Sequence, residues 1–157
     1  MFSYDESFLE ELRIKALEFL NVDVKNVMVK FVESEVLNKH KTSISLLTFG
    51  QYTRYNNTVL LNKNVEILSM LSCFFHEMTH FRQYEEGRLE NIFDDEGILT
   101  HFLYEGIHYD YDYPYAFRPW EIEADQEAGK SFKEFVKAAG NTDFLVKLLD
   151  EHKKGMI

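Results

Sequence analysis

The segment 64–86 limits the fold of this chain more than any other. Its apolar side chains are too closely spaced to occupy only one face of a helix; they are Val65, Ile67, Leu68, Leu71, Phe74, Phe75, Met78 and Phe81. A helix with so little polar surface has to be covered on most sides by the rest of the protein. We therefore predict a deeply buried helix that ends near Gly87, since glycine commonly follows the last turn of a helix.

The segments around this helix predict an α+β fold, with a small N-terminal sheet packed on the helix and further helices toward the C-terminus. A Ser-x-x-Glu pattern at 3–6 is typical of a helix N-terminus, and helical periodicity continues to Asn21. Strands are predicted at 27–32, 44–49, 51–55 and 58–62. The last two flank Asn56-Asn57, a dipeptide that tolerates the backbone conformations of a tight hairpin.

The C-terminal half contains two more predicted helices. Pro119 is suited to the first position of a helix, which we expect to end at Gly140. Thr142 is positioned to cap a last helix that ends near Gly155. The segment 89–106 has no clear period; we expect a helix near 98–104 within it, followed by an irregular, tyrosine-rich stretch.

The composition excludes several classes of protein. The 157 residues predict a single domain spanning 1–157. A net charge of −10 offers no basic surface to nucleic acid or to an anionic membrane, and no apolar stretch is long enough to span one. Because the chain shows no signal-peptide pattern and has a single cysteine, Cys73, we expect a cytoplasmic protein. The oligomeric state is left open.

A metal-binding pattern lies in the middle of the buried helix. His76 and His80 are four residues apart, so both imidazoles project from the same helix face, and two such imidazoles can share one zinc ion. Glu77 lies beside them, in position to take a proton from a zinc-bound water. The alternative is a pair of core histidines satisfied by hydrogen bonds, because an imidazole is costly to bury without a polar partner.

Two motifs together resemble those of the zincin metallopeptidases. His76-Glu77-x-x-His80 is similar to their first motif, and the residues Arg-Pro-Trp-Glu-Ile-Glu-Ala-Asp at 118–125 resemble the second motif of the gluzincin branch. The resemblance implies a minimal zincin-like domain in which His76, His80 and Glu121 bind zinc and Asp125 supports a ligand. The Glu-x-x-Ala-Asp form of the second motif, at 121–125, is that of the CAAX-processing and heat-shock membrane metallopeptidases. Unlike those proteins, this chain shows no membrane-spanning segment in its sequence. In size it is similar to small soluble phage and bacterial metallopeptidases.

Helical facing separates Glu121 from Glu123, because residues two apart point in directions about 200° apart. Steps of three or four from Glu121 reach Ala124, Ala128, Phe132, Phe135 and Ala139, whereas the same steps from Glu123 reach Glu127, Lys130, Glu134 and Lys137. We therefore expect Glu121 to be buried as a metal ligand and Glu123 to be solvated. A buried ion pair of Glu121 with Arg82 or Arg118 is the alternative. Asp125, one turn on, is positioned to accept a hydrogen bond from a ligating histidine.

These residues predict a zinc-dependent metallopeptidase with one Zn²⁺ per chain and Glu77 as its general base. His108, Tyr109 and Arg118 are the candidates for stabilising the transition state, although a tyrosine-rich stretch can equally cover the core. The expected substrate is a protein or peptide, cleaved by endopeptidase rather than exopeptidase action and bound as an added strand at a sheet edge. The alternative is a catalytically inactive zincin-fold protein that binds a protein partner.

Overall fold

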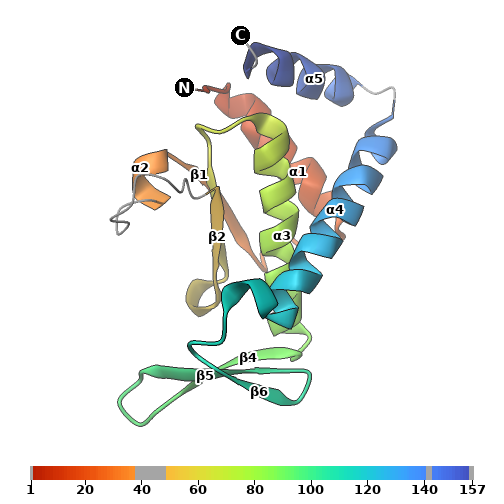
Figure 1. Cartoon of the computed structure of the whole chain (residues 1–157). Coiled ribbons are helices and arrows are strands. Elements are labelled where there is room, and N and C mark those ends of the chain that lie inside the picture. Colours follow the sequence, from red (N-terminus) through yellow and green to blue (C-terminus); the bar gives the residue numbers. More distant parts are fainter. Residues whose placement is uncertain (1, 38–48, 141–142, 156–157) are drawn as a thin grey trace.

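The computed structural model describes residues 2–37, 49–140 and 143–155 (Figure 1). The helices are α1 (Glu6–Phe19), α2 (Ser34–Leu37), α3 (Ile67–Glu85), α4 (Pro119–Ala139) and α5 (Asp143–Gly155), with 3₁₀ turns at Arg54–Asn56 and Tyr115–Phe117. The strands are β1 (Met28–Val32), β2 (Gly50–Thr53), β3 (Thr58–Asn62), β4 (Leu89–Phe93), β5 (Leu99–Tyr104) and β6 (Ile107–Asp110). The predicted α+β class is confirmed.

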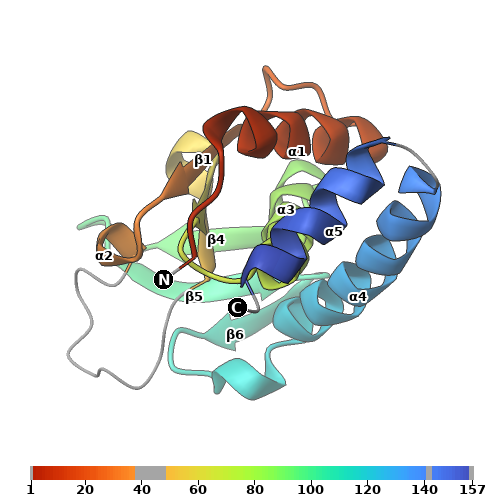
Figure 2. The same cartoon turned by 90° about the horizontal axis from the view of Figure 1, so that it is seen from above.

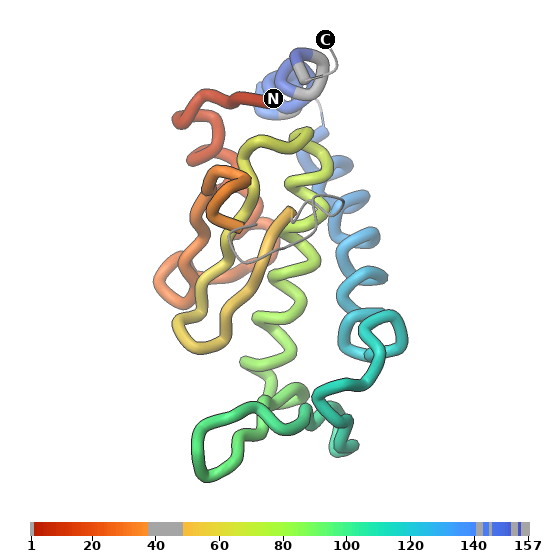
Figure 3. Tube along the Cα trace, turned by 60° about the vertical axis from the view of Figure 1, so that its left-hand side comes forward, coloured from red at the N-terminus to blue at the C-terminus, as the bar shows by residue number. Residues whose placement is uncertain are grey.

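Helix α3 forms the centre of the molecule, as its sequence predicts. Figure 3 shows it between the first sheet and α4, and Figure 2 shows α5 lying between α1 and α4. The Glu66 side chain caps α3 by accepting hydrogen bonds from the backbone N–H groups of Leu68 and Ser69, at 2.9 and 3.0 Å. In the core, Phe75 of α3 makes edge-on contacts with Phe19 of α1 and Phe135 of α4. This packing fixes the positions of α3 and α4 relative to each other.

The first sheet has the order β1-β3-β2, with β1 parallel and β2 antiparallel to the central strand β3. The predicted hairpin is confirmed: β2 and β3 are joined by the 3₁₀ turn, and Asn57 has a positive φ of 48°. Among the described strands, β2 lies at one edge of this sheet, against α3. Its approach depends on Gly50, since a Cβ there would lie 2.6 Å from Cys73 Sγ.

A second sheet, with the antiparallel order β4-β5-β6, follows α3 (Figure 1). The predicted helix near 98–104 is therefore wrong, and the stretch after it is less irregular than expected because it contains β6. Along β5, Phe102 and Tyr104 are buried against Trp120 while their neighbours are not, which is the period of a strand. Both hairpins have tight turns with positive φ, at Gly97 and at Glu105-Gly106.

Smaller differences concern the ends of elements. Helix α1 is capped by Asp5, whose side chain accepts from the Ser7 backbone N–H, instead of by Ser3. The predicted strand at 44–49, apart from Phe49, and the predicted cap Thr142 lie outside the described residues. Within the described ranges, the structure has no helix of the length and apolar character needed to cross a membrane.

Candidate metal centre

The packing of α4 against α3 brings His76, His80 and Glu121 together. Glu121 Oε1 lies 2.5 Å from His80 Nε2 and 3.5 Å from His76 Nε2, and the two imidazole rings are 4.9 Å apart between centroids. One potential ligand atom from each of the three residues lies within 4.8 Å of the other two. Within the described part of the chain, no other group of three histidine, cysteine or acidic side chains is close enough together to hold a metal ion. The set of two imidazoles and one carboxylate that the sequence predicts is thus present as a cluster.

The Glu121 carboxylate fits a cation in this cluster. Glu121 is 7% exposed, and its second oxygen, Oε2, is buried with no hydrogen-bond partner among the described residues. Burial alone raises the pKa of this carboxyl, but hydrogen bonds with the two histidines outweigh it and lower the pKa to about 2. An ionised carboxylate with an unsatisfied buried oxygen is costly unless a positive charge compensates it. A metal ion held by these three side chains would supply that charge.

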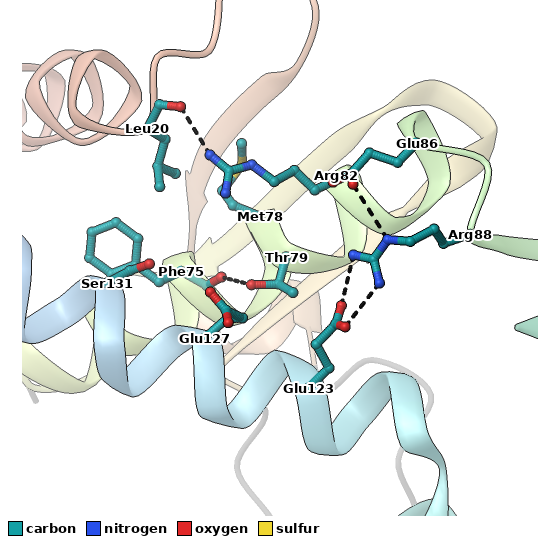
Figure 4. A pocket seen from close by; sticks show the side chains of 10 residues that line it. All are labelled: Leu20, Phe75, Met78, Thr79, Arg82, Glu86, Arg88, Glu123, Glu127 and Ser131. Atoms are coloured by element: carbon teal, nitrogen blue, oxygen red, sulfur yellow. Dashed lines mark hydrogen bonds and ion pairs between the residues drawn. The ribbon is translucent and has the colours of Figure 1, made fainter. Parts of the chain in front are cut away.

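The ion pairs proposed as an alternative for Glu121 are not present. Arg82 donates to the backbone carbonyl of Leu20, as Figure 4 shows, and Arg118 donates to the carbonyls of Tyr113 and Tyr111. Both guanidinium groups therefore have other partners, and Glu121 pairs with the histidines.

Hydrogen bonds orient both imidazoles. His76 Nδ1 lies 2.9 Å from Asp125 Oδ1, the contact that the spacing of Glu121 and Asp125 predicts. His80 Nδ1 lies 2.8 Å from Oε1 of Gln83, a residue that the sequence analysis does not single out. The available signal in the sequence was a glutamine three residues after His80, on the same helix face; the structure shows that it is buried. Each acceptor holds a proton on Nδ1 and so directs Nε2 of the ring at the cluster, where it can bind a metal once it has lost its own proton.

Glu77 lines a cavity of about 430 Å³ next to this cluster. His76, Gly50 and Tyr115 also line it. Burial raises the pKa of the Glu77 carboxyl above its usual value, although the two histidines and the Tyr52 backbone N–H act in the opposite direction. A carboxyl with a raised pKa is suited to general-base work near neutral pH, because its basicity approaches what proton transfer requires.

The structure presents Tyr115 at this cavity instead of His108, Tyr109 or Arg118. His108 packs against His101 at 4.8 Å between centroids, and Tyr109 packs edge-on against Trp120 and Tyr113. None of the three predicted candidates lines the cavity that contains His76 and Glu77.

Tyr115 lies in the segment that the sequence analysis favours, beside the acidic groups of the site. Burial and the nearby carboxylates of Glu121, Glu77 and Asp125 raise the pKa of its phenol, so it remains a proton donor. The signal for this residue was weak, because the sequence cannot tell which tyrosine of such a run faces the site.

The expectation that Glu123 is solvated is wrong. Its side chain is 28% exposed and accepts hydrogen bonds from Arg88, Tyr104 and Gln83. Burial raises the pKa of this carboxyl, but these hydrogen bonds lower it to about 2. The reason for the difference is the second sheet, which covers this side of α4 with Tyr104 of β5.

Comparison of the chain with protein-family models, with curated proteins and with solved structures finds no match. The functional argument therefore rests on the arrangement of side chains at the α3–α4 interface.

Proposed function

We propose that this protein is a zinc-dependent metallopeptidase that hydrolyses peptide bonds in a protein or peptide substrate. The observation that carries the proposal is the convergence of His76, His80 and Glu121, with Glu77 beside them in the same cavity. Two imidazole nitrogens and one carboxylate form a ligand set typical of catalytic zinc, which leaves a position open for water or substrate. Bound there, zinc would polarise the scissile carbonyl and acidify water.

The chain's own residues supply the proton transfers. Glu77 takes a proton from the attacking water as the water oxygen bonds to the carbonyl carbon, and then gives that proton to the leaving amine as the C–N bond breaks. The Tyr115 phenol donates a hydrogen bond to the carbonyl oxygen as negative charge develops on it. Asp125 and Gln83 keep the two imidazoles in the orientation that ligation needs.

The edge of β2 supports binding of an extended substrate. Asn62 N–H donates to Phe49 O at 2.9 Å, so the backbone groups of Phe49 and Gln51 face β3. Because these directions alternate along a strand, the backbone groups of Gly50 and Tyr52 face away from the sheet, toward the site of Glu77. A substrate strand that pairs with this edge would pass beside the metal ligands.

Metal analysis tests the proposal first. We expect one Zn²⁺ per chain in protein purified without chelators, and an affinity that falls as the pH is lowered. Burial lowers the pKa of His76 and His80, but Glu121 and Glu77 outweigh it and raise both above 6.5, so protons compete with zinc already near neutral pH. Titration with a chelator at several pH values measures this. A protein that takes up no zinc would refute the metal centre.

Cleavage of unfolded peptides tests the activity itself. We expect the zinc-loaded protein to release fragments from a peptide library, detected by mass spectrometry, and removal of zinc to abolish them. A protein that binds zinc and a partner but cleaves nothing would support the inactive binding protein instead.

Replacement of Tyr115 by phenylalanine tests the phenol. We expect kcat to fall by about 10²–10³-fold with little change in KM, because the hydrogen bond strengthens only as charge develops on the carbonyl oxygen. Tyr111→Phe is the matched control, since Tyr111 comes from the same segment but does not line the cavity. Equal rates for Tyr115→Phe and the wild-type protein would remove Tyr115 from the mechanism.

A further inference from the structure

We propose that Glu123 is a positioning residue for the metal centre: it fixes the orientation of the Gln83 amide, and that amide holds the imidazole ring of His80 through its Nδ1 atom. The inference rests on the proposed metal site but goes beyond its ligands, because it assigns a role to a carboxylate on the opposite side of α4 from Asp125. The connecting residues are Arg88, Tyr104, Glu123 and Gln83.

Gln83 is the link between Glu123 and the metal ligand. Its side chain is wholly buried, and both ends of its amide are engaged. Oε1 lies 2.8 Å from His80 Nδ1, while Nε2 donates to Glu123 Oε1 at 2.9 Å and to the Trp120 carbonyl at 3.0 Å. Both hydrogens of its NH₂ group and one acceptor site of its carbonyl oxygen are therefore used.

The partners of Gln83 determine which way its amide points. The Trp120 carbonyl and the Glu123 carboxylate are both acceptors, so only the NH₂ end of the amide can satisfy them. The carbonyl end must then face His80, and it can accept only from a protonated Nδ1. His80 therefore donates its Nδ1–H to Gln83, which fixes the plane of the ring and points Nε2 at the Glu121 side of the site, where a metal would bind.

Glu123 is itself held rigidly by the second sheet and the turn before it. Arg88, just after α3, makes two hydrogen bonds of 2.9 Å to its two oxygens, and the Tyr104 hydroxyl on β5 donates to Oε2 at 2.9 Å. Figure 4 shows the guanidinium of Arg88 facing the Glu123 carboxylate. With Gln83, four hydrogen bonds converge on the two carboxylate oxygens, which leaves them acceptors only.

Loss of the carboxylate weakens this hold. In Glu123→Gln one of the two acceptors of the Gln83 amide becomes an uncharged amide, whose NH₂ group cannot accept when it faces Gln83. The Trp120 carbonyl then holds the NH₂ end of Gln83 alone. A less firmly held Gln83 orients the His80 ring less firmly, so the ring is less well preorganised for the metal.

The test compares Glu123→Gln with Glu105→Gln. Both remove the charge of a carboxylate bound to Arg88, but Glu105 lies 3.0 Å from Arg88 Nη1, and no contact between Glu105 and Gln83 is present in the described chain. We expect zinc affinity, measured by chelator competition, to fall about 10–100-fold in Glu123→Gln and to stay near the wild-type value in Glu105→Gln. ¹⁵N NMR of the metal-free proteins should show slowly exchanging side-chain NH₂ protons of Gln83 in the wild type and in Glu105→Gln, and faster exchange of these protons in Glu123→Gln.

The NMR measurement separates this inference from the proposed function. A wild-type protein that binds no zinc but shows slowly exchanging Gln83 protons would refute the metal site alone. Wild-type zinc affinity together with unchanged Gln83 exchange in Glu123→Gln would overturn the inference. Should Glu123→Gln fail to fold, Gln83→Met removes the hydrogen bond to His80 with a side chain of similar length. It should weaken zinc binding by about 10–100-fold, and wild-type affinity there would be equally contrary.

Discussion

Replacing Glu77 with glutamine is expected to lower the rate of peptide hydrolysis by about 10²–10⁴-fold while zinc stays bound. Glutamine keeps the shape of the side chain and can still hydrogen-bond a water molecule, but it cannot take the proton of that water. The three proposed ligands do not include Glu77, so the metal centre should remain intact. Initial rates of zinc-loaded protein on a cleaved peptide, together with the zinc content of the same sample, measure both expectations.

Glu85→Gln is the matched control for this variant. Glu85 ends the same helix, is well exposed and pairs with Arg54 at 2.8 Å, away from the metal ligands. It should cleave at the wild-type rate. A Glu77→Gln protein with full zinc content and wild-type turnover would contradict the assignment of Glu77 as the base and would point to proton transfer by another group.

The two helices that build the site could be predicted because their signals are local. Helix α3 follows from its dense apolar residues, and α4 from Pro119 at its start, Gly140 at its end and the apolar stripe that continues from Glu121. Once both helices are given, the spacing of His76 and His80 and the facing of Glu121 leave few ways for the three side chains to point. That these two helices meet was implied by the resemblance of their motifs to those of the gluzincins, and the helical facing then selected Glu121 over Glu123.

The second sheet could not be predicted in the same way. Strand β5 is six residues long, and its alternation is weakened by Leu103, which lies on the less buried face between Phe102 and Tyr104. What stabilises β5 as a strand is long-range packing of those two aromatic rings against Trp120. The error about Glu123 follows directly, since without β5 nothing in the sequence covers that face of α4.

The position of Tyr115 depends on the contacts of one side chain, Arg118, with the loop before α4. Arg118 donates to the carbonyls of Tyr113 and Tyr111, and its guanidinium lies over the rings of Phe102, Tyr115 and Trp120. Arg118 was proposed as a residue of the reaction, but its contacts hold the loop that presents Tyr115. A loop held by one side chain and several carbonyls has no periodic sequence signal.

Removal of Glu121 is expected to have the largest effect on zinc binding. Glu121→Ala deletes one of three ligands and leaves two imidazoles, so we expect loss of stoichiometric zinc in chelator competition. Asp125→Ala keeps all three ligands but removes the acceptor 2.9 Å from His76 Nδ1, and should weaken binding by about 10–100-fold. A Glu121→Ala protein that retains zinc with wild-type affinity would show that the carboxylate is not a ligand.

Glu123→Ala distinguishes the solvated Glu123 expected from the sequence from the Glu123 of the structure, which is hydrogen-bonded to Gln83. A solvated Glu123 predicts unchanged zinc affinity for this variant. The contact of Glu123 with Gln83 predicts a weakened affinity, smaller in effect than the loss of Glu121, because the ligands stay in place and only the orientation of His80 is released. Glu127→Ala is the control, since Glu127 lies one turn further on the exposed side of α4. Zinc loss in Glu123→Ala combined with zinc retention in Glu121→Ala would mean that the ligand itself is misassigned, since a positioning residue cannot matter more than the ligand it serves.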